Sequence, residues 1–372
     1  MSSAERTIHG LLAEAGIHPN GGNPWDLQVH NPDFYGRVLT GGSLAMGESY
    51  MDGWWDCDDL AGMFERLTRA GIQRRVRPAS LVFPYVKEQL LNMQTRRRSR
   101  KVARQHYDRG NDLYEAMLDP YMQYTCAYWK DADNLDQAQR DKLDLICRKL
   151  QLRPGMRVLD TGCGFGGFAR YAAEHHGVEV YGVTLSKEQA AFGTELCKGL
   201  PVTLEVKDYR DVTERNFDRV ASIGIMEHVG TKNYRAYLRQ MSRCLKDDGL
   251  MLLHTIGSEI TGKVTDRWIA KYIFPNSILP SAAELTRAAE QVLVLEDWHN
   301  FGASYAKTLL AWNANCEAAW GRLPADRYDE RFRRMWRYYL LTCAGAFASR
   351  SIHLWQLVLS KGGMVGGYDA PR

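Results

Sequence analysis

The sequence contains no apolar run that approaches the roughly 20 residues needed to span a bilayer. Its eight cysteines are scattered and form no CxxC pair. We therefore expect no metal site and no disulfide framework, and a reducing, cytoplasmic setting. The N-terminal stretch MSSAERTIHGLLAEAG has no uninterrupted apolar core, so we expect no signal peptide. Internal repeats are also lacking, and 45% hydrophobic with 25% charged residues over 372 positions predicts a soluble globular protein of about two domains.

Positive charge is scarce at the start of the chain and concentrated directly after it. Residues 1–65 hold two basic and ten acidic side chains, whereas residues 66–109 hold thirteen basic and two acidic ones. The remainder is nearly neutral, so the net charge of +4 conceals this asymmetry. A block this basic is typical of a segment that binds a polyanion, such as phospholipid head groups or nucleic acid, and a solvated, charged linker is the simpler alternative.

Three parts are predicted along the chain. Residues 1–95 form a small, mainly helical domain, in which HPNGGNPWD is a turn-rich loop and ASLVFPYVKEQLLNM a candidate helix. Residues 96–120 form a basic connector and lid segment, and residues 121–372 form the larger domain. There QAQRDKLDLICRKLQL is an amphipathic helix, and apolar strands alternate with helices through RVLDTG, VEVYGVTLS, VTLEVKD, FDRVASIG and GLMLLHTIG. This alternation predicts an α/β fold with a parallel sheet, completed by VLVLEDW and IHLWQLVLSK, with helices at about 302–320 and 327–348 between them.

A glycine loop, VLDTGCGFGG, follows the first of these strands and precedes a helix. Glycines at 162, 164, 166 and 167 permit a tight turn and a close approach of a ligand to the backbone. The order is GxGxGG rather than the GxGxxG of dinucleotide folds, and Asp160 stands at the strand end. An acidic residue there suits a small cationic ligand better than a pyrophosphate, and a glycine-rich turn without a ligand is the alternative.

Polar residues also stand where the next strands end. Thr184 and Gln189 offer hydrogen bonds where nucleotide folds often place an acidic ribose clamp. Asp208 and Tyr209 are placed to meet an adenine, although Asp208 is equally explained as a loop cap. Because ligands bind at the carboxyl ends of parallel strands, these positions share one rim of the sheet with the glycine loop and two later residues, Glu227 and His254.

The fourth strand runs into SIGIMEHVG, without the Asn/Asp-Pro-Pro-aromatic element of methyltransferases that act on exocyclic amines. Glu227 is a candidate acid/base group or the neighbour of an anion site. His228 is a candidate helix cap or core histidine.

Several long motifs together resemble the cyclopropane fatty acid synthases, the family that includes the mycolic acid cyclopropane synthases. The resemblance covers roughly residues 100–362 and rests on HYDRGNDLYEAMLDPYMQYTCAYWKDADNLDQAQ, LDTGCGFGGFA, GVTLSKEQ, MEHVG, LLHTIG, KYIFPN, LEDWHNFGASYAKTL and CAGAFASRSIHLWQLVLSKG. The N-terminal region resembles the extra domain of the bacterial phospholipid enzymes. The chain departs from the family at Phe165, where a Trp is usual, and at Ile225-Met226, where an aromatic often stands.

The resemblance implies a class I S-adenosylmethionine-dependent methyltransferase fold with a seven-stranded, mostly parallel sheet. It implies transfer of the methyl group of S-adenosylmethionine to a cis double bond of an acyl chain in a membrane phospholipid. A carbocation follows, which aromatic faces stabilise and from which water must be excluded. A bound bicarbonate then takes a proton so that the ring closes, and its implied ligands are Cys126, Glu227, His254, Ile256 (through its backbone) and Tyr305. Without the resemblance, the favoured interpretations are a core aromatic for Tyr305 and a satisfied strand residue for His254.

The same resemblance implies the cofactor contacts and a role for Cys126. The cofactor is expected to contact Tyr124, Thr125, Gly162, Gly164, Thr184, Gln189 and Tyr209, beside the strand-end residues Asp160 and Asp208. Cys126, in QYTCAYWKD, is expected to form a wall of the anion site rather than to act as a nucleophile. Candidate aromatics around the cation are Trp129, Tyr272, Tyr305 and Tyr338.

A membrane substrate gives the basic block a purpose. We expect peripheral, reversible attachment to anionic lipid at the inner face of the membrane through the N-terminal domain and Arg74, Arg75, Arg77, Arg96, Arg97 and Arg98. A homodimer is expected from the family, and no nucleic acid partner. The alternatives are a relative that hydrates or reduces the cation, an RNA methyltransferase, and a lipid-binding protein with an inactive methyltransferase fold.

Overall fold

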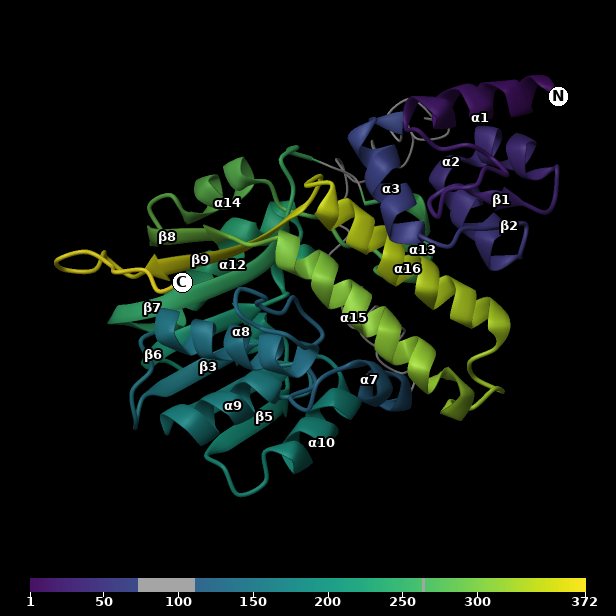
Figure 1. Cartoon of the computed structure of the whole chain (residues 1–372). Coiled ribbons are helices and arrows are strands. Elements are labelled where there is room, and N and C mark those ends of the chain that lie inside the picture. Colours follow the sequence, from purple (N-terminus) through teal and green to yellow (C-terminus); the bar gives the residue numbers. More distant parts are fainter. Residues whose placement is uncertain (73–110, 263–264) are drawn as a thin grey trace. The chain divides into compact units, whose positions relative to one another are not determined.

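The computed structural model describes residues 1–72, 111–262 and 265–372 and contains two compact units (Figure 1). One unit groups the described residues of Met1–Asn92, Val264–Asn276 and Tyr305–Ile352, and the other those of Met93–Lys263, Ser277–Ser304 and His353–Arg372. The units are therefore interleaved along the chain, which a linear division at residues 95 and 120 does not capture. The candidate helix at residues 79–93 lies outside the described residues, as does most of the connector.

The larger unit is built on a seven-stranded sheet of order β5-β4-β3-β6-β7-β9-β8. The pairs from β5 to β7 are parallel, and β9 pairs antiparallel with both β7 and β8. The strands are β3 (Arg157–Thr161), β4 (Glu179–Thr184), β5 (Val202–Val206), β6 (Phe217–Ile223), β7 (Leu245–Gly257), β8 (Val294–Asn300) and β9 (His353–Ser360). The sheet confirms the predicted α/β class and the place of the two last strands.

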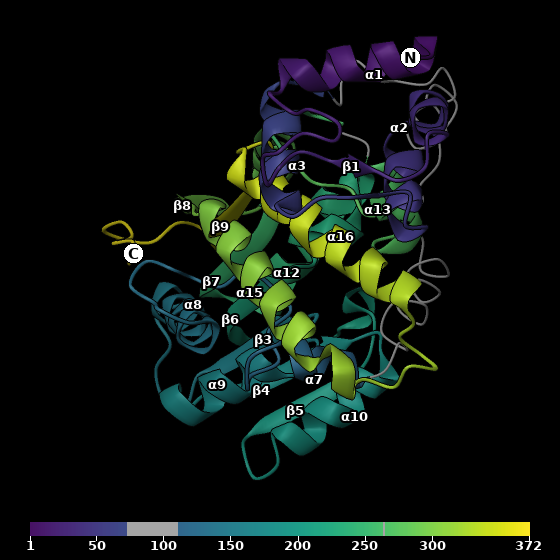
Figure 2. The same ribbon diagram turned by 45° about the vertical axis from the view of Figure 1, so that its right-hand side comes forward.

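Helices cover both faces of this sheet (Figures 1 and 2). The helices of this unit are α7 (Asn111–Met117), α8 (Leu135–Lys149), α9 (Gly167–His176), α10 (Lys187–Leu196), α11 (Met226–Val229), α12 (Tyr234–Cys244) and α14 (Ala282–Ala289), with the short turns η2 (Tyr209–Asp211) and η3 (Thr231–Asn233). Adjacent residues of β3 face opposite ways: Val158 packs with α8 and α9, and Leu159 with α12 and α14. Burial on both faces explains why central strands such as β3, β6 and β9 read as apolar runs.

The smaller unit is mainly helical, as predicted for the N-terminal region. It contains α1 (Ser3–Glu14), β1 (Gln28–Val29), α2 (Phe34–Met51), β2 (Trp55–Asp56), α3 (Leu60–Arg69), α13 (Arg267–Tyr272), α15 (Ala303–Ala319, from Tyr305 onward), η4 (Trp320–Arg322) and α16 (Glu330–Ala348). Helices α3 and α16 approach closely at Gly345, where an added Cβ would lie 2.6 Å from the Ala61 carbonyl oxygen. The stretch HPNGGNPWD forms turns without helix or strand, as expected.

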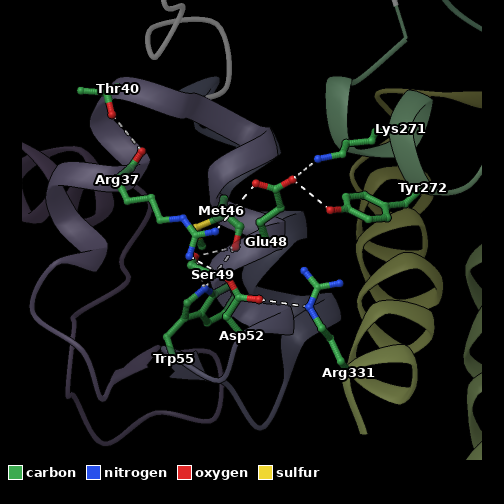
Figure 3. A network of polar contacts seen from close by, with 10 residues as sticks. All are labelled: Arg37, Thr40, Met46, Glu48, Ser49, Asp52, Trp55, Lys271, Tyr272 and Arg331. Carbon is green, nitrogen blue, oxygen red and sulfur yellow. Dashed lines mark hydrogen bonds and ion pairs between the residues drawn. The ribbon is translucent and has the colours of Figure 1, made fainter. Parts of the chain in front are cut away.

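Ion pairs within this unit join segments that are far apart in sequence (Figure 3). Glu48 of α2 accepts hydrogen bonds from the Lys271 ammonium at 2.5 Å and the Tyr272 hydroxyl at 2.9 Å. Asp52 accepts from Arg37 at 2.9 Å and from Arg331 of α16 at 3.2 Å. These contacts explain why α13 and α16 group with the N-terminal helices rather than with the sheet that flanks them in sequence.

Candidate active site

The glycine loop turns sharply between β3 and α9, and the backbone requires glycine there. Gly162, Gly164 and Gly166 have φ values of 93°, 52° and 79°, a region that side chains disfavour. An added Cβ at Gly162 would also lie 1.9 Å from the Ile225 side chain. Because the turn carries no side chain at these three positions and leads into the N-terminus of α9, it is suited to a ligand that approaches the main chain.

Asp160 lies at the end of β3, directly before this loop. It is 1% exposed, and neither of its carboxyl oxygens has a hydrogen-bond partner among the described residues. Burial raises its pKa to about 7, and the charge of Lys142 opposes that rise. The carboxyl therefore has unused hydrogen-bonding capacity, and its predicted contact with a cationic ligand stays a prediction.

The ends of β4 and β5 carry the remaining predicted cofactor residues. Thr184 and Gln189 are buried and bonded to each other, with 3.1 Å between the hydroxyl and the amide oxygen. Asp208 caps η2 and forms an ion pair with Arg210 at 2.6 Å, two contacts that fit the loop-capping interpretation. Tyr209 packs edge-on against Tyr237, with ring centroids 4.9 Å apart, and lines a cavity of about 170 Å³.

Glu227 enters the site from α11, after β6, and its carboxyl is almost fully buried. One carboxyl oxygen accepts a hydrogen bond from the Ile256 amide at 2.6 Å, and the other has no partner among the described residues. Burial raises its pKa to about 7, although the Ile256 amide favours the ionised form. The expectation that the Ile256 amide donates directly to an anion is therefore not what the structure shows, because that amide already has Glu227 as its acceptor.

His254 lies near the end of β7 and is 1% exposed. Burial lowers its pKa well below 6.5, and the charges of Lys142 and Lys149 add to the effect, so the ring is neutral. The Gln356 amide nitrogen lies 3.2 Å from Nδ1. An amide NH2 donates only, so Nδ1 accepts and the ring hydrogen resides on Nε2. Nε2 has no partner among the described residues, so His254 presents a buried donor and is not a fully satisfied strand residue.

The other implied site residues lie in different surroundings. Cys126 is fully buried, and its thiol lies 3.2 Å from the Ala127 carbonyl oxygen. Tyr305 belongs to the smaller unit, where its ring centroid lies 4.4 Å from that of Phe347, with the rings tilted by 30°. Among the candidate aromatics of that unit, Tyr272 donates to Glu48, and Tyr338 lies in an aromatic core. The larger unit thus holds Cys126, Glu227, His254 and Ile256, together with Trp129.

Comparison with known proteins identifies the family. A family model described as mycolic acid cyclopropane synthetase matches residues 94–357. The cyclopropane-fatty-acyl-phospholipid synthase of Escherichia coli strain K12 is 53% identical over 96% of this chain and 93% of its own length. The chain belongs to the mycolic acid cyclopropane synthetase family. A probable fatty acid methyltransferase of Pseudomonas putida is 38% identical over 72% of this chain and 70% of its own length.

Solved structures of the family have the same fold. The mycolic acid cyclopropane synthase CmaA1, solved with S-adenosylhomocysteine and CTAB, aligns with a TM-score of 0.65 and 32% identity, over 70% of this chain and 97% of that one. A coclaurine N-methyltransferase at 20% identity aligns with a TM-score of 0.66, which shows the fold alone. Together with the sheet order, these matches confirm the class I S-adenosylmethionine-dependent methyltransferase fold.

Two buried polar residues near the candidate site are not among the site residues that the sequence predicts. Gln356 lies in an apolar strand, and Lys142 lies on α8, and each is fully buried. A signal for Lys142 is present in the sequence, because it occupies the apolar face of its helix together with Ala138 and Leu145. Gln356 gives no such signal, since its partner His254 lies 102 positions away.

Proposed function

We propose that this protein converts a cis double bond of a phospholipid acyl chain into a cyclopropane ring, with a bound bicarbonate as the base. The enzyme is an S-adenosylmethionine-dependent methyltransferase, a cyclopropane-fatty-acyl-phospholipid synthase, as its family and its match along 96% of the chain indicate. S-adenosylmethionine supplies the methyl group when bound. The buried pair of Glu227 and His254, each with a polar atom that lacks a partner among the described residues, is the observation that carries the bicarbonate proposal.

The chemistry of these two residues fits a protonated oxyanion. Bicarbonate, when bound, would supply the base that takes a proton from the added methyl group. His254 offers Nε2–H as a donor to an anionic oxygen, because Gln356 fixes the tautomer and burial keeps the ring neutral. Glu227 offers a carboxyl oxygen as the acceptor of the bicarbonate hydroxyl. A bare carboxylate would repel an anion, and a hydroxyl donated to Glu227 removes that conflict.

The Ile256 amide has an indirect role in this proposal. It donates to one Glu227 oxygen at 2.6 Å and so directs the other oxygen to the ligand. Cys126 and Tyr305 complete the proposed ligand set, and Tyr124, Thr125, Asp160, Gly162, Gly164, Thr184, Gln189, Asp208 and Tyr209 the proposed cofactor set. Burial of Glu227 and His254 favours a site that excludes water, which would otherwise trap the cation.

The reaction is tested with S-adenosylmethionine and vesicles of unsaturated phospholipid, followed by mass analysis of the acyl chains. We expect the chains to gain one CH2 unit and to lose the alkene signal. Turnover should fall in buffer stripped of bicarbonate and return when bicarbonate is added. An unchanged acyl pool would contradict the proposed activity, and full turnover without bicarbonate would contradict the proposed base alone.

The same measurement separates the nearest alternative, a relative that hydrates or reduces the cation. Hydration would add a methyl and a hydroxyl group, and reduction would leave a methyl branch. The presence of Cys126, Glu227, His254 and Tyr305 at positions implied for bicarbonate, with Ile256 supporting Glu227, favours ring closure.

Membrane attachment is proposed to be peripheral. Within the described ranges, no helix combines the length and apolar character of a membrane span. Arg74, Arg75, Arg77, Arg96, Arg97 and Arg98 lie outside the described residues, so their lipid contact stays a prediction. Each is expected to contribute about 1 kcal/mol on an anionic surface.

We expect vesicle sedimentation to show stronger binding to anionic than to neutral phospholipid, with the difference lost at high salt and in a variant with these six arginines replaced by glutamine. Equal binding to both vesicle types at low salt would exclude the electrostatic mechanism. The homodimer also stays a proposal, and sedimentation velocity of the purified chain tests it, with a monomer as the contrary result.

A further inference from the structure

A short segment of the larger unit lies against both halves of the proposed site. A Cβ added at Gly167, where α9 begins, would lie 1.7 Å from the Tyr121 carbonyl oxygen. A Cβ added at Gly224, after β6, would lie 3.2 Å from the Thr125 methyl group. The segment from Tyr121 to Cys126 therefore packs against the helix that follows the glycine loop and against the turn that leads to Glu227.

Two neighbouring side chains of α8 hold this segment in place. The Gln139 amide donates to the carbonyl oxygens of Thr125 at 3.0 Å and Gln123 at 3.3 Å. The Lys142 ammonium donates to the Thr125 hydroxyl at 3.0 Å and to the Gln123 side-chain oxygen. Both α8 residues are fully buried, so these bonds form away from water, where they are strongest.

The charge of Lys142 is also surrounded by groups of the site. Burial lowers its pKa to about 8, while Asp119, Cys126 and Asp160 favour the charged form. Asp119 in turn accepts from the backbone N–H groups of Gln123 at 2.8 Å and Tyr121 at 2.9 Å. A buried ammonium without partners is costly, and Lys142 and Asp119 both bond to the same segment, so the two charges and the segment form one connected network.

We propose that Lys142 is a positioning residue for methyl transfer, which holds Gln123 and Thr125 and thereby the segment that borders the methyl donor and the anion. The proposal rests on the proposed cofactor role of Tyr124 and Thr125. Lys142 itself touches no reacting atom. Its effect is to hold the segment from Tyr121 to Cys126 in place beside the glycine loop. Small displacements of residues that position a reactant lower the reaction rate strongly.

Lys149 provides a matched control on the same helix. It is also fully buried, and its pKa is likewise lowered to about 8 by burial. Its ammonium lies 3.4 Å from the Asp297 carboxylate and 3.2 Å from the His299 ring, so it contacts no residue of the segment among its described partners. Replacement of either lysine by methionine removes one buried ammonium of α8, and only Lys142→Met releases the segment.

The test measures binding of S-adenosylhomocysteine by calorimetry, steady-state kinetics with S-adenosylmethionine and phospholipid vesicles, and the melting temperature of each variant. For Lys142→Met we expect kcat/KM for S-adenosylmethionine to fall about 100-fold, with weaker S-adenosylhomocysteine binding and an unchanged KM for lipid. Lys149→Met should stay within about twofold in both binding and kinetics at a similar loss of melting temperature. Gln123→Met removes an acceptor of the Lys142 ammonium. In the double variant, the decrease in kcat/KM should therefore be no larger than in Lys142→Met alone.

Equal losses for the two lysine variants would overturn the proposal, because they would reflect stability alone. Unchanged S-adenosylhomocysteine binding in Lys142→Met would overturn it as well. If Lys142→Met does not fold, Gln123→Met takes its place, and normal cofactor affinity in that variant would overturn the proposal. Bicarbonate plays no part in the binding measurement, so failure of the proposed base would appear only in turnover. Tyr124→Leu with unchanged affinity would instead count against the cofactor contact on which the proposal rests.

Discussion

Glu227→Gln is expected to lower kcat for cyclopropane formation by about 10²- to 10⁴-fold, the range typical of a lost acid–base group. Glutamine keeps the oxygen that accepts from the Ile256 amide, so the local backbone should be unchanged. It loses the carboxylate that is proposed to receive the bicarbonate hydroxyl. Acyl-chain mass analysis should also show whether the residual product carries a methyl and a hydroxyl group in place of a ring, which would place the defect at the deprotonation step.

Stability should move in the opposite direction from activity. The folded pKa of Glu227, about 7, lies above its usual value of 4.5, so the protein loses stability as the pH rises from about 4.5 to about 7, and the full cost of ionising this buried group remains at higher pH. Glutamine removes that cost, and we expect its melting temperature at pH 8 to equal or exceed that of the unmodified protein. S-adenosylhomocysteine binding and Glu227→Ala serve as controls, with binding retained in both variants. Near-normal turnover in either variant would exclude the assigned role.

Gln356→Glu is expected to reduce kcat by about 100-fold or more, although residue 356 touches neither substrate nor cofactor in the proposed mechanism. The Gln356 amide donates to Nδ1 of His254 and leaves the hydrogen on Nε2. An ionised carboxylate accepts instead, so it would draw the hydrogen to Nδ1 and turn Nε2 into an acceptor that repels an anion. The larger effect should be on bicarbonate dependence, with a higher bicarbonate concentration needed for half-maximal turnover.

Gln356→Met is the matched control, since it removes the donor without imposing the opposite tautomer. We expect its kcat to fall by about 10-fold, which lies between the values for the unmodified protein and for Gln356→Glu. Nitrogen-15 chemical shifts of selectively labelled histidine should report hydrogen on Nε2 of His254 in the unmodified protein and on Nδ1 in Gln356→Glu. Equal losses in both variants with an unchanged tautomer would show that packing at position 356, and not the direction of the hydrogen bond, is what matters.

Local patterns in the sequence determined most of the larger unit. The strands that end at Thr161 and Thr184 read as apolar runs because both faces of the sheet are buried, and the glycine loop follows because its φ values exclude most side chains. The rule that ligands lie at the carboxyl ends of parallel strands then placed Asp160, Glu227 and His254 on one rim. Each of these inferences uses neighbours within a few positions, which is the range over which periodicity and turn chemistry act.

Contacts between distant positions were decided only by the tertiary structure. The Ile256 amide bonds to Glu227 and not to a ligand, and Gln356 fixes the tautomer of His254 from another strand. Lys142 reaches Thr125 from a helix that periodicity alone makes amphipathic. Helix α13 groups with α2 through Glu48 and Lys271, 223 positions apart, so the two units interleave along the chain. Hydrogen bonds and ion pairs depend on distances of a few ångström in space, and a one-dimensional pattern contains no such distances between remote residues.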